Sequence, residues 1–156
     1  MNEELYLLDN NALSHLTRAQ RASAFFHERC ALPSEIIHEA QGYPDAASFK
    51  DVEYPTTASV LKHLGTVMAT VPADDTTLVN LYANKGAADP MLIACALDGK
   101  EEAATALWGP TWVIVSNDNA VRAKAAELGV ESCTREGFLA RTTGEWEGDR
   151  SEPRLN

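Results

Sequence analysis

Short apolar runs alternate along the chain with longer segments of mixed polar and apolar residues. The runs at residues 5–8, 30–32, 67–71 and 111–116 have the length of β-strands, and a last strand is predicted at 130–133. The run at 111–116 is almost continuously apolar, which is typical of a parallel strand buried on both faces. We therefore predict an α/β fold, a single three-layer α/β/α domain with a parallel sheet of about five strands.

The segments between these runs predict helices. They fall at residues 18–29, 35–41, 56–64, about 75–84, 90–97, 100–108 and 117–128, with a loop at 42–55. Thr17 and Ser34 are the expected N-caps of the first two helices. Gly65 is expected to end the third helix and Gly129 to follow the last one.

The chain of 156 residues is long enough for one domain with its own core. We assign residues 1–141 to this domain and predict a polar, flexible tail over 142–156. No apolar run approaches the roughly 20 residues of a membrane helix, and the acidic start is unlike a secretory signal. Cys30, Cys95 and Cys133 form no CxxC pair, so we expect free thiols, no membrane association and a cytoplasmic location.

The charge of the chain is strongly negative. Its formal net charge is -10, with 13 Lys and Arg against 23 Asp and Glu. This balance excludes a broad basic face that coats nucleic acid nonspecifically. It is compatible with an enzyme that holds a phosphate backbone locally through metal ions and a few basic side chains, and it would also suit a basic partner protein.

Four acidic residues lie at the edges of the predicted strands and helices. Asp9 follows the first apolar run, Asp118 follows the run at 111–116, Asp89 lies at a helix start, and Glu39 lies about one turn into the helix after the second run. In a parallel α/β sheet, side chains at the carboxyl ends of the strands converge on one crevice. Clustered carboxylates repel one another, and a divalent cation relieves that repulsion. The set therefore predicts a metal site suited to phosphodiester chemistry.

Each acid taken singly also has a simpler explanation. Asp89 and Asp118 fit helix N-caps, and Glu39 fits a solvated helix surface. Glu35, on the same helix, is a rival for Glu39. Competing α/β chemistries lack their motifs, since no GxGxxG follows the first strand and the chain has no GxxxxGK[ST] or GxSxG. The combination of four acids is what favours a metal-dependent enzyme.

The segments around these acids resemble a known family. In order along the chain they are YLLDNNAL at 6–13, LPSEIIHE at 32–39, AADPMLIACA at 87–96 and IVSND at 114–118. Their order, spacing and flanking residues resemble the PIN domain, the ribonuclease fold of VapC-type toxins, over roughly residues 4–140. The long stretch at 99–110 and the acidic charge depart from the family's pattern.

The resemblance implies a specific site. In the family, four acids bind Mg²⁺ or Mn²⁺ and carry the catalysis, and they match Asp9, Glu39, Asp89 and Asp118. The same match gives supporting roles to Asn11 and Ser116. The resemblance further implies an RNA substrate, a cognate antitoxin lying across the crevice, and a homodimer.

We therefore expect a metal-dependent endoribonuclease, a hydrolase that acts as the toxin of a type II toxin–antitoxin pair. One alternative is a catalytically inactive PIN-like scaffold that binds a partner protein, which the negative charge and the capping explanations would suit. Another is a structure-specific DNA nuclease, because related folds cut DNA. Stabilisation by Mn²⁺ separates the first alternative from the enzyme, and digestion of single-stranded RNA beside flapped DNA separates the second.

Overall fold

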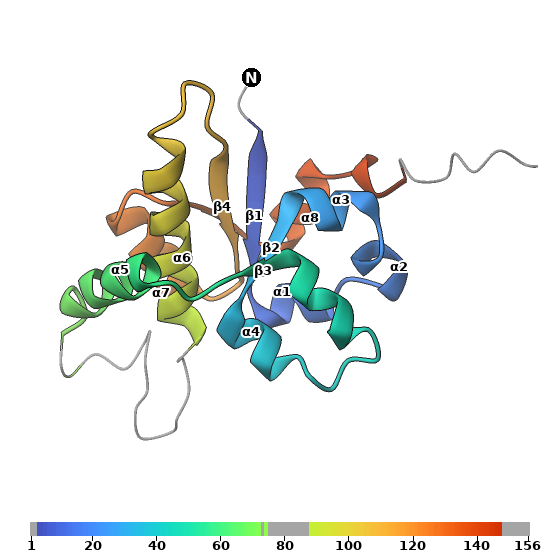
Figure 1. Ribbon diagram of the computed structural model, residues 1–156, viewed down its shortest axis with the longest axis horizontal. Helices are drawn as coiled ribbons and strands as arrows, with labels where there is room; N and C mark the ends of the chain where they lie inside the picture. Colours follow the sequence, from blue (N-terminus) through green and yellow to red (C-terminus); the bar gives the residue numbers. More distant parts are fainter. Residues whose placement is uncertain (1–2, 73, 75–87, 148–156) are drawn as a thin grey trace, which may run out of the picture.

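The computed structural model describes residues 3–72, 74 and 88–147, which form an α/β domain around a five-stranded sheet (Figure 1). The strand order is β3-β2-β1-β4-β5, and all neighbouring strands are parallel. The strands are β1 Glu4–Leu8, β2 Cys30–Pro33, β3 Glu53–Tyr54, β4 Thr111–Val115 and β5 Glu131–Cys133. The predicted parallel α/β sheet is confirmed.

Helices cover both faces of this sheet, which makes three layers. Helices on one face are α1 Asn10–Ser14, α2 Arg18–Arg21, α3 Ala24–Arg29, α4 Ser34–Glu39 and α8 Arg135–Arg141, together with the 3₁₀ helices η1 Ala46–Val52 and η2 Glu145–Glu147. The other face carries α5 Ala58–Ala69, α6 Ala88–Ala103 and α7 Asn119–Glu127. Figure 1 shows these two groups on opposite sides of β1 and β4.

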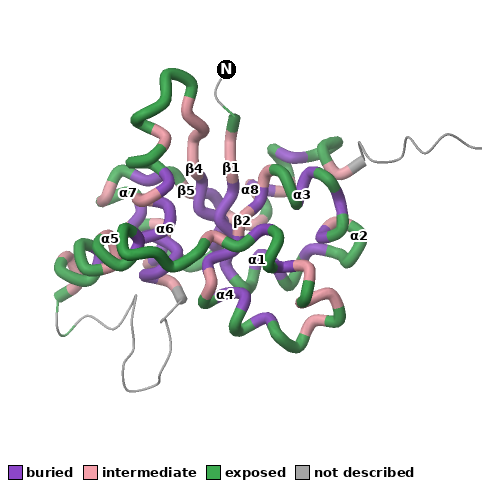
Figure 2. Tube along the Cα trace, viewed as in Figure 1, coloured by how far each residue is buried: buried purple, intermediate pink, exposed green. Residues whose placement is uncertain are grey.

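The alternation of side chains along the inner strands divides the core in two. Tyr6 and Leu8 of β1 join the apolar cluster under α1, α3 and α8, whereas Leu7 points into the cluster under α5, α6 and α7. Val113 and Ile114 of β4 divide in the same way. This is the period-2 geometry of a strand with both faces covered, and Figure 2 shows the buried residues gathered along these strands.

The strand order creates a switch point between β1 and β4. From β1 the chain moves outward through β2 and β3, then returns to place β4 on the opposite side of β1, followed by β5. Ligands of open α/β sheets bind in the crevice outside the carboxyl ends of the strands at such a reversal. The residues that follow these two strands, Asp9 and 116–118, therefore occupy the expected position of a site.

The first two predicted helices differ from the structure in one interior break and one helix start. Thr17 caps α2 as predicted, with a full capping box, but the helix expected over 18–29 is divided at Ser23. The Ser23 hydroxyl accepts a hydrogen bond from Phe26 N and starts α3 as a new helix. Ser34 was wrong as an N-cap, because Pro33 occupies the cap position and Ser34 is already helical.

The region between β2 and α6 also differs. The predicted loop at 42–55 contains η1 and the short strand β3, which pairs with β2. Gly65 does not end a helix, because α5 continues through it to Ala69, and the strand predicted at 67–71 was wrong. Val60 and Val67 are fully buried on the face of α5 that packs against α6, and this packing overrides the glycine. The helix predicted at about 75–84 lies outside the described residues.

The two helices predicted at 90–97 and 100–108 are joined into α6, which ends at Ala103. Gly99 lies inside this helix, where it faces the indole of Trp112 on β4. A Cβ atom at position 99 would come within 2.5 Å of Trp112 Nε1. The glycine therefore allows α6 to lie closer to the sheet than any larger residue would. Gly129 has a φ of 75° after α7, as expected for a helix C-terminus.

The folded domain extends beyond Arg141. Thr142 is buried, and its hydroxyl accepts a hydrogen bond from Trp146 Nε1 at 3.2 Å. The ring of Trp146 lies edge-on to Phe25 with 4.6 Å between the centroids. The first residues of the predicted tail thus pack on the domain, and the remainder, 148–156, lies outside the described residues.

None of the helices in the described ranges has the length and apolar character needed to cross a bilayer.

Candidate active site

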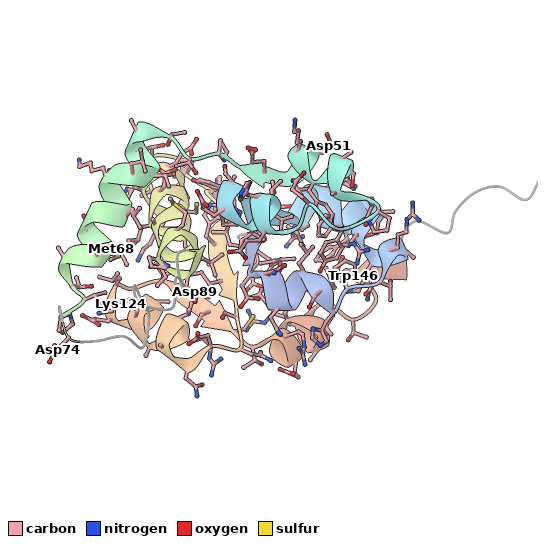
Figure 3. All side chains as sticks on the ribbon, turned by 90° about the horizontal axis from the view of Figure 1, so that it is seen from below. Asp51, Met68, Asp74, Asp89, Lys124 and Trp146 are labelled. Carbon is pink, nitrogen blue, oxygen red and sulfur yellow. The ribbon has the colours of Figure 1, made fainter. Side chains whose placement is uncertain are left out.

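A cavity of about 390 Å³ opens at the switch point. Its lining comes from the ends of β1 and β4 and from α1, α4 and α6, and consists of Asp9, Asn10, Asn11, Ile36, Glu39, Asp89, Asn117 and Asp118. All four predicted acids therefore line a single pocket. Figure 3 views the molecule from below, the side on which β1 ends, and labels Asp89 at the start of α6.

Asp9 is the most buried of the four acids, with 7% of its surface exposed. It is the N-cap of α1, and its Oδ1 accepts a hydrogen bond from Ala12 N at 2.7 Å. Burial raises the pKa of its carboxyl above the usual value, whereas the bonds from Ala12 N and the Ser116 hydroxyl lower it. The nearby charge of Asp118 raises this pKa further, and Arg135 lowers it.

Asp118 is the N-cap of α7, so the capping explanation holds for this residue. Its Oδ1 accepts hydrogen bonds from Ala120 N at 2.8 Å and Val121 N at 3.4 Å. Its own backbone N–H donates to the hydroxyl of Ser116, which is fully buried beneath the pocket. Ser116 thus connects Asp9 with Asp118.

Asp89 has a different relation to its helix. It belongs to the first turn of α6 instead of preceding the helix, so the N-cap explanation was wrong for this residue. Its pKa is raised to about 6, first by partial burial and then by the charges of Asp118, Asp9 and Glu39. The other three carboxylates are therefore close enough to Asp89 to oppose its ionisation.

Glu39 is the last residue of α4 and is exposed on the pocket wall. Glu35, its rival on the same helix, does not line the pocket. The effect of Glu39 on the pKa of Asp89 places its charge near the other three acids. Of these two glutamates, only Glu39 lines the pocket.

The donor set of the pocket suits a hard divalent cation. Its polar lining is made of carboxylates and amides, whose oxygens are the ligands that Mg²⁺ and Mn²⁺ prefer. Within the described ranges, no three acidic, histidine or cysteine side chains are already gathered in a coordinating arrangement. The capping hydrogen bonds contribute to this separation of the acids, because one oxygen of Asp9 and one of Asp118 point at helix backbone N–H groups instead of at each other.

Sequence reasoning did not identify Asn10 and Asn117, which line the pocket, or Arg135, which lies beside it. Asn117 lines the pocket, and its Oδ1 accepts a hydrogen bond from Arg135 N at 2.7 Å. Arg135 also donates from Nη1 to Oδ1 of Asn11, the predicted supporting residue, at 3.0 Å. A signal was available, because Arg135 follows the last strand and so lies at the same carboxyl edge as the acids.

Comparison with known proteins gives no family for the chain. No protein-family model matches the sequence, and no curated protein matches it significantly. A function for this protein must therefore be inferred from the chemistry of the pocket and from the residues around its acids.

Proposed function

We propose that this protein is a metal-dependent endoribonuclease that hydrolyses RNA phosphodiester bonds, and that it is the toxin of a type II toxin–antitoxin pair. The observation that carries the proposal is the convergence of four acids on one pocket at the switch point of the sheet. The four segments around these acids are also the ones that resemble the PIN domain.

Asp9 and Asp89 would be the principal ligands of Mg²⁺ or Mn²⁺, and Glu39 and Asp118 would complete the site directly or through water. When bound, the ion would activate a water for attack on phosphorus and neutralise charge on the phosphate oxygens. The caps hold Asp9 and Asp118 in one orientation, so less side-chain entropy is lost when a ligand binds. The pKa of Asp89 is raised first by burial and then by the negative charges of the other three acids, and a bound cation would offset those charges.

The proposed setting follows from the resemblance. A cognate antitoxin would lay a segment across the pocket, and the protein would form a homodimer. A basic antitoxin segment would be attracted to a chain of net charge -10. We place the pair in the cytoplasm because Cys30, Cys95 and Cys133 are free thiols.

The test is cleavage of a mixed tRNA and ribosomal RNA pool with Mn²⁺. Wild type and Glu35→Gln are expected to give the same discrete products, whereas Asp89→Asn and Glu39→Gln lose about 100-fold or more in rate. Glu35 is the matched control because it shares α4 with Glu39 but does not line the pocket. Flapped DNA is digested in parallel, since a DNA nuclease would use the same acids. Undiminished RNA cleavage by Asp89→Asn would contradict the proposal.

One observation favours a second candidate, a PIN-like scaffold without catalysis. Asp9 and Asp118 already serve as N-caps, which alone would explain two of the four acids. A scaffold predicts that Mn²⁺ does not stabilise the fold. A rise in melting temperature with Mn²⁺ that is lost in Asp9→Asn would decide for the enzyme.

A further inference from the structure

Arg135 is anchored to the wall of the acidic pocket. It is the first residue of α8, and its Nη1 lies 3.0 Å from both Asn11 Oδ1 and His15 Nδ1. Its backbone N–H donates to Asn117 Oδ1 at 2.7 Å. Asn11 and Asn117 both line the pocket, one after β1 and the other after β4. Arg135 is thus held at the rim by contacts of its side chain with Asn11 and His15 and of its backbone with Asn117.

The position of this cation matters because the pocket repels the proposed substrate. Four carboxylates line the cavity, and a phosphate backbone that approaches them carries the same sign of charge. Arg135 is close enough to this cluster that its charge lowers the pKa of Asp9. Arg122, a second arginine at this end, donates instead to the Ser116 carbonyl and to the Asn119 side chain.

The guanidinium of Arg135 retains donors for a ligand. It has five N–H donors, and its contacts with the described residues involve Asn11, His15 and Glu136. The bond to Glu136 is 2.8 Å long, but the Glu136 side chain is 62% exposed, and exposed ion pairs contribute little. A phosphate can therefore replace Glu136 at small cost, and the planar fork of arginine suits two phosphate oxygens.

We propose that Arg135 binds a phosphate of the RNA strand at the rim of the pocket and so admits an anionic substrate to an acidic site. Asn11 positions the guanidinium, Asn117 holds the backbone of Arg135, and Glu136 occupies the guanidinium until the phosphate arrives. This inference rests on the proposed ribonuclease function, and it adds a substrate-binding residue outside the four acids.

The test measures the kinetics of RNA cleavage for Arg135→Gln and Arg135→Lys as a function of salt. We expect Arg135→Gln to raise KM about tenfold with a smaller change in kcat, because a charge-assisted bond to the substrate is lost. The slope of log(kcat/KM) against log salt should shrink by about 0.7, the value for one phosphate contact on a single strand. Arg135→Lys keeps the charge and should restore most of that slope.

Arg141→Gln is the matched control. Arg141 lies on the same helix but contacts Glu4, at the start of β1 and hence at the opposite end of the sheet. Its KM and salt slope should equal those of the wild type. The rise in melting temperature with Mn²⁺ should be unchanged in Arg135→Gln, which shows that the fold and the metal site are intact.

The outcomes separate this inference from the function on which it rests. Wild-type cleavage with an unaltered KM and salt slope in Arg135→Gln overturns the role of Arg135 alone. Loss of the Mn²⁺ shift in Arg135→Gln also overturns it, because the residue would then hold the pocket together instead of binding substrate. Absence of cleavage by the wild type overturns the ribonuclease and this inference together.

Discussion

The strand-end acids and the helix-borne acids share one pocket but differ in their relation to the fold. Asp9 and Asp118 follow β1 and β4, and each caps the helix that comes next. Glu39 and Asp89 lie within α4 and α6 and face the pocket from the helices. A residue can therefore cap a helix and line the pocket at the same time. Substitutions of Asp9 and Asp118 must keep the cap if they are to test the pocket alone, whereas substitutions of Glu39 and Asp89 need not.

The largest expected effect is the loss of stabilisation by Mn²⁺, and it should be the same for both groups of acids. Mn²⁺ at about 100 times its Kd should raise the free energy of unfolding of the wild type by about 2.7 kcal/mol. Asp9→Asn, from the first group, and Asp89→Asn, from the second, should both lose this stabilisation because each removes a principal ligand. Thermal unfolding with and without Mn²⁺ measures it, and EDTA should reverse it. Retention of the full shift in Asp89→Asn would leave the helix-borne acids outside the metal site.

The next effect belongs to the strand-end acids alone. Without metal, Asp118→Ala should lose about 1 kcal/mol of stability because α7 loses its cap, whereas Asp118→Asn should lose little because asparagine caps equally well. Denaturant titration in EDTA measures both variants. Equal losses for alanine and asparagine would show that the cap contributes little.

For Asp89 we expect a smaller effect in the opposite direction, a gain in stability when its carboxylate is removed. Its pKa in the folded protein, about 6, lies above the ordinary 3.8, so the folded state prefers the protonated form. Ionisation therefore lowers stability as the pH rises from about 4 to 6, and the loss persists above that range. Asp89→Asn should stabilise the metal-free protein at pH 7 by less than about 1 kcal/mol, because solvent screening and the N-terminus of α6 offset part of the penalty.

The pH dependence provides the control for this prediction. Wild type and Asp89→Asn should have the same stability below about pH 4, where Asp89 is protonated in both states. Unfolding curves in EDTA at several pH values compare them. A destabilised Asp89→Asn at pH 7 would mean that the carboxylate supports α6 more than its neighbours oppose it.

The smallest effect is expected at Glu39. Glu39→Gln should change the stability of the metal-free protein by no more than about 0.5 kcal/mol, since the residue is exposed at the end of α4. The same denaturant titration, with Glu35→Gln alongside, measures it. A large loss at Glu39 would give this acid a structural role and weaken the contrast with Asp9 and Asp118.

Much of the site could be predicted from sequence because it depends on strand ends. The strands β1, β2 and β4 correspond to short apolar runs and β5 to the strand predicted at 130–133, and the residues after these strands fall at one edge of the sheet. The strand predicted at 67–71 failed because a short apolar run is compatible with either structure, and packing of α5 on α6 decided for helix. The two-residue strand β3 has no apolar run, and only its pairing with β2 defines it.

The position of Arg135 at the carboxyl edge of the sheet follows from the sequence, but the role proposed for it does not. A lone arginine after a strand is ordinary on a surface, and its importance comes from the side chains of Asn11 and Asn117, which are distant in sequence. The resemblance already favoured Glu39 over Glu35, but which of the two lines the pocket depends on the orientation of α4, because both residues are acidic and only four positions apart.

The contact of Gly99 with Trp112 gives α6 a mechanical role. The helix carries Asp89 in its first turn and lies against the indole about 15 Å further along its axis, at 1.5 Å per residue. A helix bends little over this length, so its packing distance from the sheet at Gly99 affects the position of the Asp89 carboxylate relative to the sheet. A methyl group at position 99 would either displace the indole or tilt the helix. The position of Asp89 in the acidic pocket thus depends on Gly99, a residue without a side chain that lies at the opposite end of the sheet.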